Sequence, residues 1–143
     1  GGYPATRTLA VKADGSGEIV WENPHNSYEQ SMLIHDGYIY ATTERGFCVC
    51  TRASDGQEMW KTRMDGKISA SPVLANGNIY VSAENGVTWV FKASHEAYQE
   101  IAQNTLGNTA YATPSFVRNN IIARVATGEG KDKTEYLYRI GEK

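Results

Sequence analysis

Two cysteines are the most reactive side chains in the sequence, and they lie two positions apart. Cys48 and Cys50 are separated by Val49 in the segment GFCVCTRA. On a β-strand such residues share a face, with Cα atoms about 6.6 Å apart, at the long edge of disulfide geometry. Two thiols also fall short of the four ligands of a structural zinc site. We therefore interpret both as small apolar side chains packed on one face of a strand, and their redox state stays open.

Carboxylates that could supply oxygen ligands occur beside recurring turns. The candidates are Asp14, Glu18, Asp55 and Glu58. Asp-Gly pairs are selected by tight turns, because these turns need residues that tolerate a positive φ. Turn geometry therefore explains the recurrence of these carboxylates better than a metal site does.

No other set of residues has the spacing of a catalytic or metal site. The three histidines, His25, His35 and His95, have no partner at metal-ligand spacing, which predicts surface or turn positions. No serine stands in a GxSxG elbow. The segment Gly128, Glu129, Gly130 lacks the helix start that a phosphate-binding loop needs. The sequence thus predicts no catalytic residues, no metal ligands and no cofactor in this chain.

Composition excludes two classes of partner. Of 143 residues, 41% are hydrophobic and 21% charged, with 14 Lys and Arg against 16 Asp and Glu, for a net charge of −2. This balance argues against nucleic-acid binding, and no apolar run is long enough to insert in a membrane. The chain starts at Gly1 without a methionine, so we expect a piece excised from a longer protein.

The elements that would position these residues repeat every 40 positions. The segment SASPVLANGNIYVSAENG (69–86) follows EQSMLIHDGYIYATTERG (29–46) at that distance. The matched pairs are Ser31 and Ser71, Gly37 and Gly77, Tyr40 and Tyr80, and Gly46 and Gly86. Ala13, Ala53 and Ala93 also step by 40. A period of 20 to 50 residues is typical of solenoids, propellers and other arrays.

Within one period the pattern predicts four short strands separated by turn pairs. Runs such as GYIYATTE and NIYVSAE alternate β-branched or aromatic residues with small or polar ones. Residues 96–106 (EAYQEIAQNTL) are the one segment with a helical alternative, and their position in the repeat favours a degenerate outer strand. In a third copy, Asn119 and Asn120 are expected to replace the Asn76–Gly77 turn. Four antiparallel strands per 40 residues indicate a propeller blade.

The fold class predicted is therefore all-β, a partial β-propeller of about three four-stranded antiparallel blades. The blade pieces are residues 8–22, 31–62, 70–103 and 112–140, all parts of one propeller domain over residues 1–143. Closed propellers have four to eight blades, so we expect the chain to be a fragment of a larger ring.

Two segments resemble the tryptophan-docking motif of quinoprotein-like propellers, built from PQQ-like repeats. They are residues 13–21, with Ala13, Gly15 and Trp21, and residues 53–60, with Ala53, Gly56 and Trp60. The resemblance implies that these six residues are structural, each tryptophan packing on the backbone of a neighbouring motif. The third copy departs from the pattern, with Glu100 and Ile101 where the tryptophan would fall. We also predict that Trp60 contributes more to stability than Trp89, which lies outside the motif.

The resemblance implies two alternatives for function. The family includes quinone-dependent dehydrogenases, which use a vicinal disulfide of adjacent cysteines, calcium and a catalytic aspartate. It also includes members without a cofactor, such as a scaffold of outer-membrane barrel assembly and propellers associated with kinases. Because Val49 separates the two cysteines, we favour a non-catalytic scaffold that binds a protein or polymer, in the periplasm or secreted. The alternative is the C-terminal part of a PQQ-dependent dehydrogenase.

The ends of the repeat array also predict self-association. The chain begins with the last two strands of a blade and ends with the first three of another. Strand edges left unpaired expose N–H and C=O groups, which proteins seldom leave bare. We therefore expect copies of the chain to associate through their terminal blades.

Overall fold

The chain forms thirteen β-strands and one short 3₁₀ helix within residues 7–141, the part that the computed structural model describes. The first two blade pieces contain β1 (Thr8–Val11), β2 (Ile19–Asn23), β3 (Leu33–His35), β4 (Tyr38–Thr42), β5 (Phe47–Arg52) and β6 (Glu58–Arg63). The others contain β7 (Val73–Ala75), β8 (Asn78–Ser82), β9 (Val87–Lys92), β10 (Glu100–Thr105), β11 (Ser115–Val117), β12 (Asn120–Thr127), η1 (Gly130–Asp132) and β13 (Thr134–Gly141). Among the described residues, no helix is long and apolar enough to cross a membrane.

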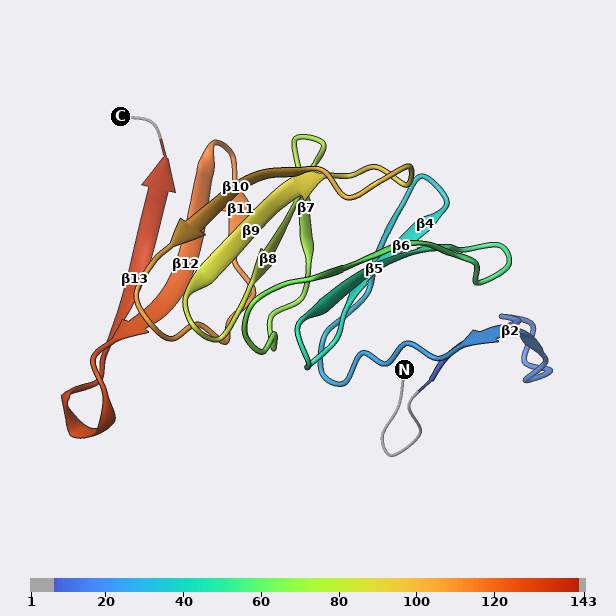
Figure 1. Ribbon diagram of the computed structural model, residues 1–143, viewed down its shortest axis with the longest axis horizontal. Helices are drawn as coiled ribbons and strands as arrows, with labels where there is room; N and C mark the ends of the chain where they lie inside the picture. The colour runs from blue at the N-terminus through green and yellow to red at the C-terminus, as the bar shows by residue number, and fades with distance from the viewer. Residues whose placement is uncertain (1–6, 142–143) are drawn as a thin grey trace.

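The strands pair into four antiparallel sheets that follow one another in chain order (Figure 1). We call them the first sheet (β1–β2), the second (β3–β6), the third (β7–β10) and the fourth (β11–β13). Each sheet is a meander whose strands are neighbours in sequence. This confirms the all-β prediction of four-stranded blades flanked by incomplete ones. Residues 100–105 form a strand, as the repeat position predicted, and not a helix.

The turn pairs identified in the sequence close the first hairpin of each complete blade. Asp36 and Gly37 have φ of 48° and 79°, and Asn76 and Gly77 have φ of 49° and 73°. Two successive positive φ values give a turn whose twist matches that of the strands. In the fourth sheet Val117 pairs with Asn120, so the turn lies at Arg118 and Asn119. The expected turn at Asn119 and Asn120 was therefore wrong by one residue.

A β-bulge recurs at the same place in each outer strand of the first three sheets. The pairing skips Val20 in β2, Met59 in β6 and Ile101 in β10. The residues paired immediately after the bulge are Trp21 with Ala10, Trp60 with Cys50, and Ala102 with Val90. The third copy thus has Ala102 at the tryptophan position, which corrects the sequence alignment to Glu100 and Ile101. Counting residues along the chain cannot locate the bulge that sets this register.

The main hydrophobic core lies between the second and third sheets. Its buried members come from both sheets and from the connection between them: Tyr40, Cys48, Cys50, Met64, Ile68, Ile79, Val81, Ala83, Trp89 and Phe91. Trp60 and Tyr98 pack against this cluster and are partly buried. Trp89 is only 3% exposed, so the structure gives no reason to expect a smaller stability loss at Trp89 than at Trp60.

Candidate functional site: the interfaces between blades

The indole of Trp21 lies on the turn of the second sheet. Its Nε1 donates a hydrogen bond of 2.8 Å to the carbonyl oxygen of Ala53. A Cβ atom added to Gly56, which has φ of +73°, would lie 2.6 Å from Cε3 of the indole. Only glycine leaves room for the ring at this place. The structure therefore brings together Trp21, Ala53 and Gly56 across the first interface.

Trp60 makes the corresponding contact with the third sheet, although the motif there has degenerated. Its Nε1 donates a 2.9 Å hydrogen bond to the carbonyl oxygen of Ser94. The ring centroid lies 6.0 Å from those of Tyr40 and Phe91 and 5.7 Å from that of Tyr98. Tilted and edge-on aromatic pairs at such distances are favourable beyond their burial. Because the acceptor is a backbone carbonyl, any residue type could serve at position 94, and no sequence pattern marks Ser94.

Ala13 and Gly15, the remaining two motif residues, lie exposed in the turn between β1 and β2. A Cβ atom added to Gly15 would meet nothing within 4 Å. No indole packs against Gly15 within residues 7–141, so the structure does not bring this pair together with a tryptophan. In the first copy of the motif, Ala13 and Gly15 are therefore turn residues without a docking contact.

Two further sets of hydrogen bonds involve other repeated positions. Met64 N donates to Gly46 O (2.7 Å) and Leu106 N donates to Gly86 O (3.0 Å), which links the end of each outer strand to the hairpin at Gly46 or Gly86. Adjacent sheets are joined where Ser31 N donates to Ser71 Oγ and Ser71 N to Thr113 Oγ1, both at 2.9 Å. The repeated serine and glycine positions are therefore structural ties.

Both cysteines are free and fully buried in the core between the second and third sheets. Burial, with a smaller contribution from neighbouring Cys50, raises the pKa of the Cys48 thiol well above its ordinary value. Burial also raises the pKa of the Cys50 thiol to about 11, against a smaller lowering by its hydrogen bond with Tyr40. The two thiols therefore pack as the small apolar side chains that the sequence suggested.

We expect both thiols to resist Ellman's reagent near pH 8 and to react only on unfolding, because the thiolate is the reactive form.

The raised pKa values of the two thiols mean that the unfolded chain loses these protons at lower pH than the folded chain. Their contribution to stability is therefore complete below about pH 9 and is lost as pH rises towards 11 and beyond. Urea midpoints measured near pH 8 and near pH 10.5 would show the fall. A Cys48→Ala/Cys50→Ala variant should lose less over this range, and an equal fall in both proteins would contradict the assignment.

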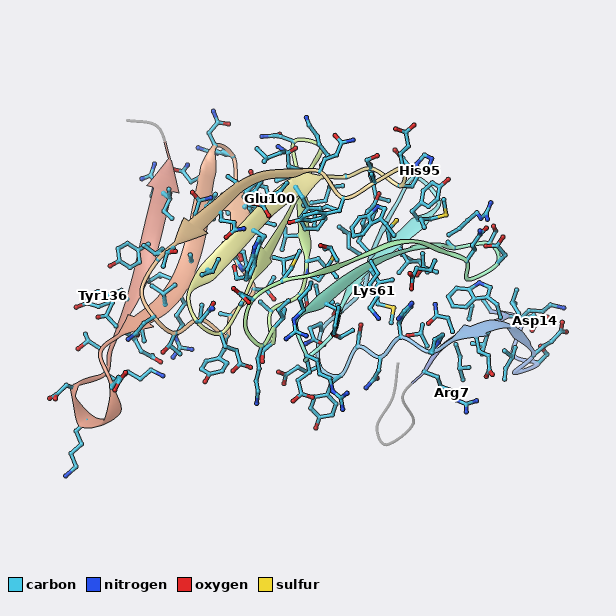
Figure 2. The ribbon with its side chains drawn as sticks, viewed as in Figure 1. Arg7, Asp14, Lys61, His95, Glu100 and Tyr136 are labelled. Atoms are coloured by element: carbon cyan, nitrogen blue, oxygen red, sulfur yellow. The ribbon has the colours of Figure 1, made fainter. Side chains whose placement is uncertain are left out.

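The four carboxylates considered as possible ligands are each engaged in hydrogen bonds or ion pairs. Asp14 Oδ1 accepts from Ser16 N (3.0 Å), and Asp55 Oδ1 accepts from Gln57 N and Arg52 Nε (both 3.1 Å). A hydrogen bond with the Ser16 side chain, and then the Ser16 backbone N–H, lowers the pKa of Asp14 from its ordinary value. The Gln57 backbone N–H is the main cause that lowers the pKa of Asp55. Figure 2 shows Asp14 at the tip of the β1–β2 hairpin, far from Glu100 on β10.

The remaining two carboxylates and the histidines form pairs rather than clusters. Glu18 pairs with Lys12, and Glu58 with His25, both at 2.6 Å. His35 pairs with Asp36 at 3.2 Å, while His95 stacks on Tyr38 with centroids 4.1 Å apart. His35 ends strand β3, and the other two histidines lie in connections. Over residues 7–141, no three His, Cys, Asp or Glu side chains gather in a way that could hold a metal ion.

Sequence reasoning missed a cavity of about 320 Å³ between the third and fourth sheets. Residues of β8, β9 and β10 line one wall, and residues of β12 and β13 line the other. The signal that could have located it is the lack of a tryptophan at the end of the third copy.

Comparison with known proteins agrees with this geometry. The family described as outer membrane protein assembly factor BamB matches residues 6–129. A comparison with curated protein sequences finds no match.

Solved structures show the same fold at low identity. BamB from Moraxella catarrhalis superposes with a TM-score of 0.70 at 15% identity, covering 94% of this chain and 44% of that one. A europium-containing methanol dehydrogenase gives 0.68 at 11% identity, covering 85% and 32%. The quinohemoprotein alcohol dehydrogenase of Comamonas testosteroni gives 0.58 at 16%, covering 69% and 17%. The chain thus spans less than half the length of each.

At such identities the structural likeness establishes the fold alone, whereas the family match extends over most of the sequence. This chain belongs to the family of outer membrane protein assembly factor BamB, propellers built from PQQ-like repeats.

Proposed function

We propose that this chain is part of a non-catalytic propeller scaffold that binds protein partners in outer-membrane protein assembly. The observation that carries the proposal is the family match over residues 6–129. The chemistry of the described residues is consistent with it, since both cysteines are buried and the candidate ligands Glu18 and Glu58 are held in ion pairs. In this proposal Trp21, Trp60, Ala53 and Gly56 hold the blades together, and Ala13 and Gly15 shape a turn. The proposed location is the periplasm or another extracytoplasmic compartment.

Photo-crosslinking of the full-length protein in cells tests the scaffold proposal. Crosslinking residues would replace exposed turn residues, such as Asp36 and Asn76, one at a time. We expect adducts with components of the outer-membrane assembly machinery, and a position on the outer strand β10 serves as the comparison. Crosslinks that are absent at every turn would overturn the proposal.

The second candidate, part of a PQQ-dependent dehydrogenase, is favoured only by fold likeness to such enzymes. The quinone absorption spectrum of the full-length protein, recorded with and without added PQQ and calcium, distinguishes the two. A saturable quinone spectrum accompanied by dye reduction with an alcohol would replace the scaffold proposal.

Self-association through the terminal blades remains a prediction for the chain as given. Among the described strands, β1 pairs only with β2 and β13 only with β12, so each has an unpaired edge. β13 also carries Leu137, which is 74% exposed. We expect sedimentation equilibrium to show a concentration-dependent mass at micromolar concentrations or above. Leu137→Lys should weaken the association, and a strict monomer at high concentration would refute it.

A further inference from the structure

The cavity between the third and fourth sheets occupies the place that an indole fills one interface earlier. Between the second and third sheets, the Trp60 ring lies against Tyr40 and Phe91. By strand register, Tyr80 of the third sheet corresponds to Tyr40 of the second. Ile140 of the fourth sheet corresponds to Phe91 of the third, because each pairs with the equivalent isoleucine of its sheet, Ile121 or Ile79. Tyr80 and Ile140 both line the cavity. The same two positions thus flank an indole in one interface and an open space in the next.

Several substitutions along the repeat together open this space. Ala123, at the position of Val81, and Ile140, at that of Phe91, line the cavity. Ala102, at the position of Trp60, lies two residues before the lining residue Asn104 and therefore on the same face of β10. Each replaces a larger side chain by a smaller one, so the sheets cannot fill the interface as the core does. The cavity is therefore a property of the sequence in this copy of the repeat.

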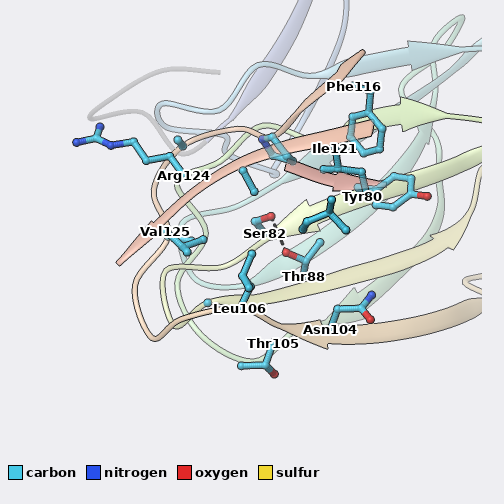
Figure 3. A pocket seen from close by; sticks show the side chains of 16 residues that line it. Tyr80, Ser82, Thr88, Asn104, Thr105, Leu106, Phe116, Ile121, Arg124 and Val125 are labelled. Atoms are coloured by element: carbon cyan, nitrogen blue, oxygen red, sulfur yellow. Dashed lines mark hydrogen bonds between the residues drawn. The ribbon is translucent and has the colours of Figure 1, made fainter. Parts of the chain in front are cut away.

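The walls of the cavity suit a neutral aromatic molecule. Figure 3 shows Tyr80, Phe116, Ile121, Leu106 and Val125 around the space. At one wall, Ser82 Oγ and Thr88 Oγ1 are hydrogen-bonded to each other at 2.8 Å, and the neutral polar residues Asn104 and Thr105 also line the space. Arg124 is the one charged residue in the lining, and its guanidinium binds the Glu135 carboxylate and extends away from the other labelled side chains. No charge is therefore aimed at a ligand.

The volume sets the size class of the ligand. An apolar cavity of about 150 Å³ is sufficient for benzene, and this one measures about 320 Å³. Ligand sites of this kind are concave and mainly apolar, with a few polar groups that orient the molecule. We propose that the space between the third and fourth sheets binds a small neutral bicyclic aromatic molecule of the indole class. This site is independent of the proposed scaffold function.

Titration of 5-fluoroindole, followed by fluorine NMR, tests the proposal on the full chain. The wild-type protein should give saturable one-site binding with half-saturation below about 1 mM. Ala102→Trp should refill the space from β10 as Trp60 does from β6, and Ala123→Phe should fill it from β12. Each is expected to weaken binding by about tenfold or more. Circular dichroism checks that each variant is folded. If one of the two variants does not fold, the other still tests whether filling the cavity weakens binding.

The matched control is Gln103→Trp, which adds an indole one residue away on the exposed, opposite face of β10. This variant should bind 5-fluoroindole as the wild type does. The proposal is overturned if the wild type shows no saturable binding, if folded filling variants bind as tightly as the wild type, or if Gln103→Trp loses binding equally. It is also overturned if a short tryptophan-containing peptide binds at the cavity while 5-fluoroindole does not, since the site would then accept a polypeptide side chain.

Discussion

Replacing Trp60 by alanine is expected to lower the free energy of unfolding by about 3 kcal/mol, at the low end of the range for core aromatics. The indole touches Tyr40, Phe91 and Tyr98, and its N–H donates to Ser94 O. Its removal leaves a hole between the second and third sheets that rigid strands cannot close. The value lies at the low end because Trp60 is only partly buried. Urea unfolding at one pH measures the change.

Two further variants separate the packing of Trp60 from its hydrogen bond. Trp60→Phe retains a ring but loses the donor to Ser94 O, so we expect a smaller loss than for alanine. Trp89→Ala should be at least as destabilising as Trp60→Ala, because Trp89 is 3% exposed. A loss below about 1 kcal/mol for Trp60→Ala would show that the indole contact does not join the sheets.

Gly46→Ala is the second substitution for which we expect a large loss. Gly46 has φ of +80°, and an added Cβ atom would lie 2.3 Å from Gly66 O and 2.7 Å from Met64 O. A left-handed conformation costs a residue with a side chain about 1–2 kcal/mol. Because both obstructing atoms are backbone, overpacking adds about 1–3 kcal/mol. The 2.7 Å hydrogen bond from Met64 N to Gly46 O would also be strained.

Gly37→Ala is the matched control for Gly46→Ala. Gly37 has φ of +79°, and a Cβ atom there would meet nothing within 4 Å. It should therefore show the conformational cost alone, about 1–2 kcal/mol. Equal urea midpoints for the two variants would mean that the contact with Met64 and Gly66 relaxes without cost.

The repeat made the fold predictable from the sequence. Side chains alternate along strands, and Asp36–Gly37 and Asn76–Gly77 mark hairpins whose backbone only a few residue types adopt. Such signals are local, and a 40-residue period repeats them, so strand number and order followed directly. The same locality explains why the outer strand at residues 100–105 was identified in spite of its helix-like composition.

The candidate site was only partly predictable, because it depends on register and on contacts between sheets. The sequence indicated Trp21 and Trp60 as docking residues but gave no acceptor for Trp60, since Ser94 contributes a backbone carbonyl. It placed Glu100 and Ile101 at the third docking position, whereas the bulge at Ile101 puts Ala102 there.

The sequence by itself thus determined the all-β class, the blade pattern and the hairpin turns of the two complete blades, because these follow from local alternation and backbone preference. The tertiary structure alone decided that Trp21 lies on Gly56, that Cys48 and Cys50 are sealed between two sheets, and that a cavity remains beside Tyr80 and Ile140. Those features depend on which side chains from residues about 40 positions apart meet across an interface. The volume left between two sheets depends on the side chains of both walls together, so the sequence of one strand alone does not determine it.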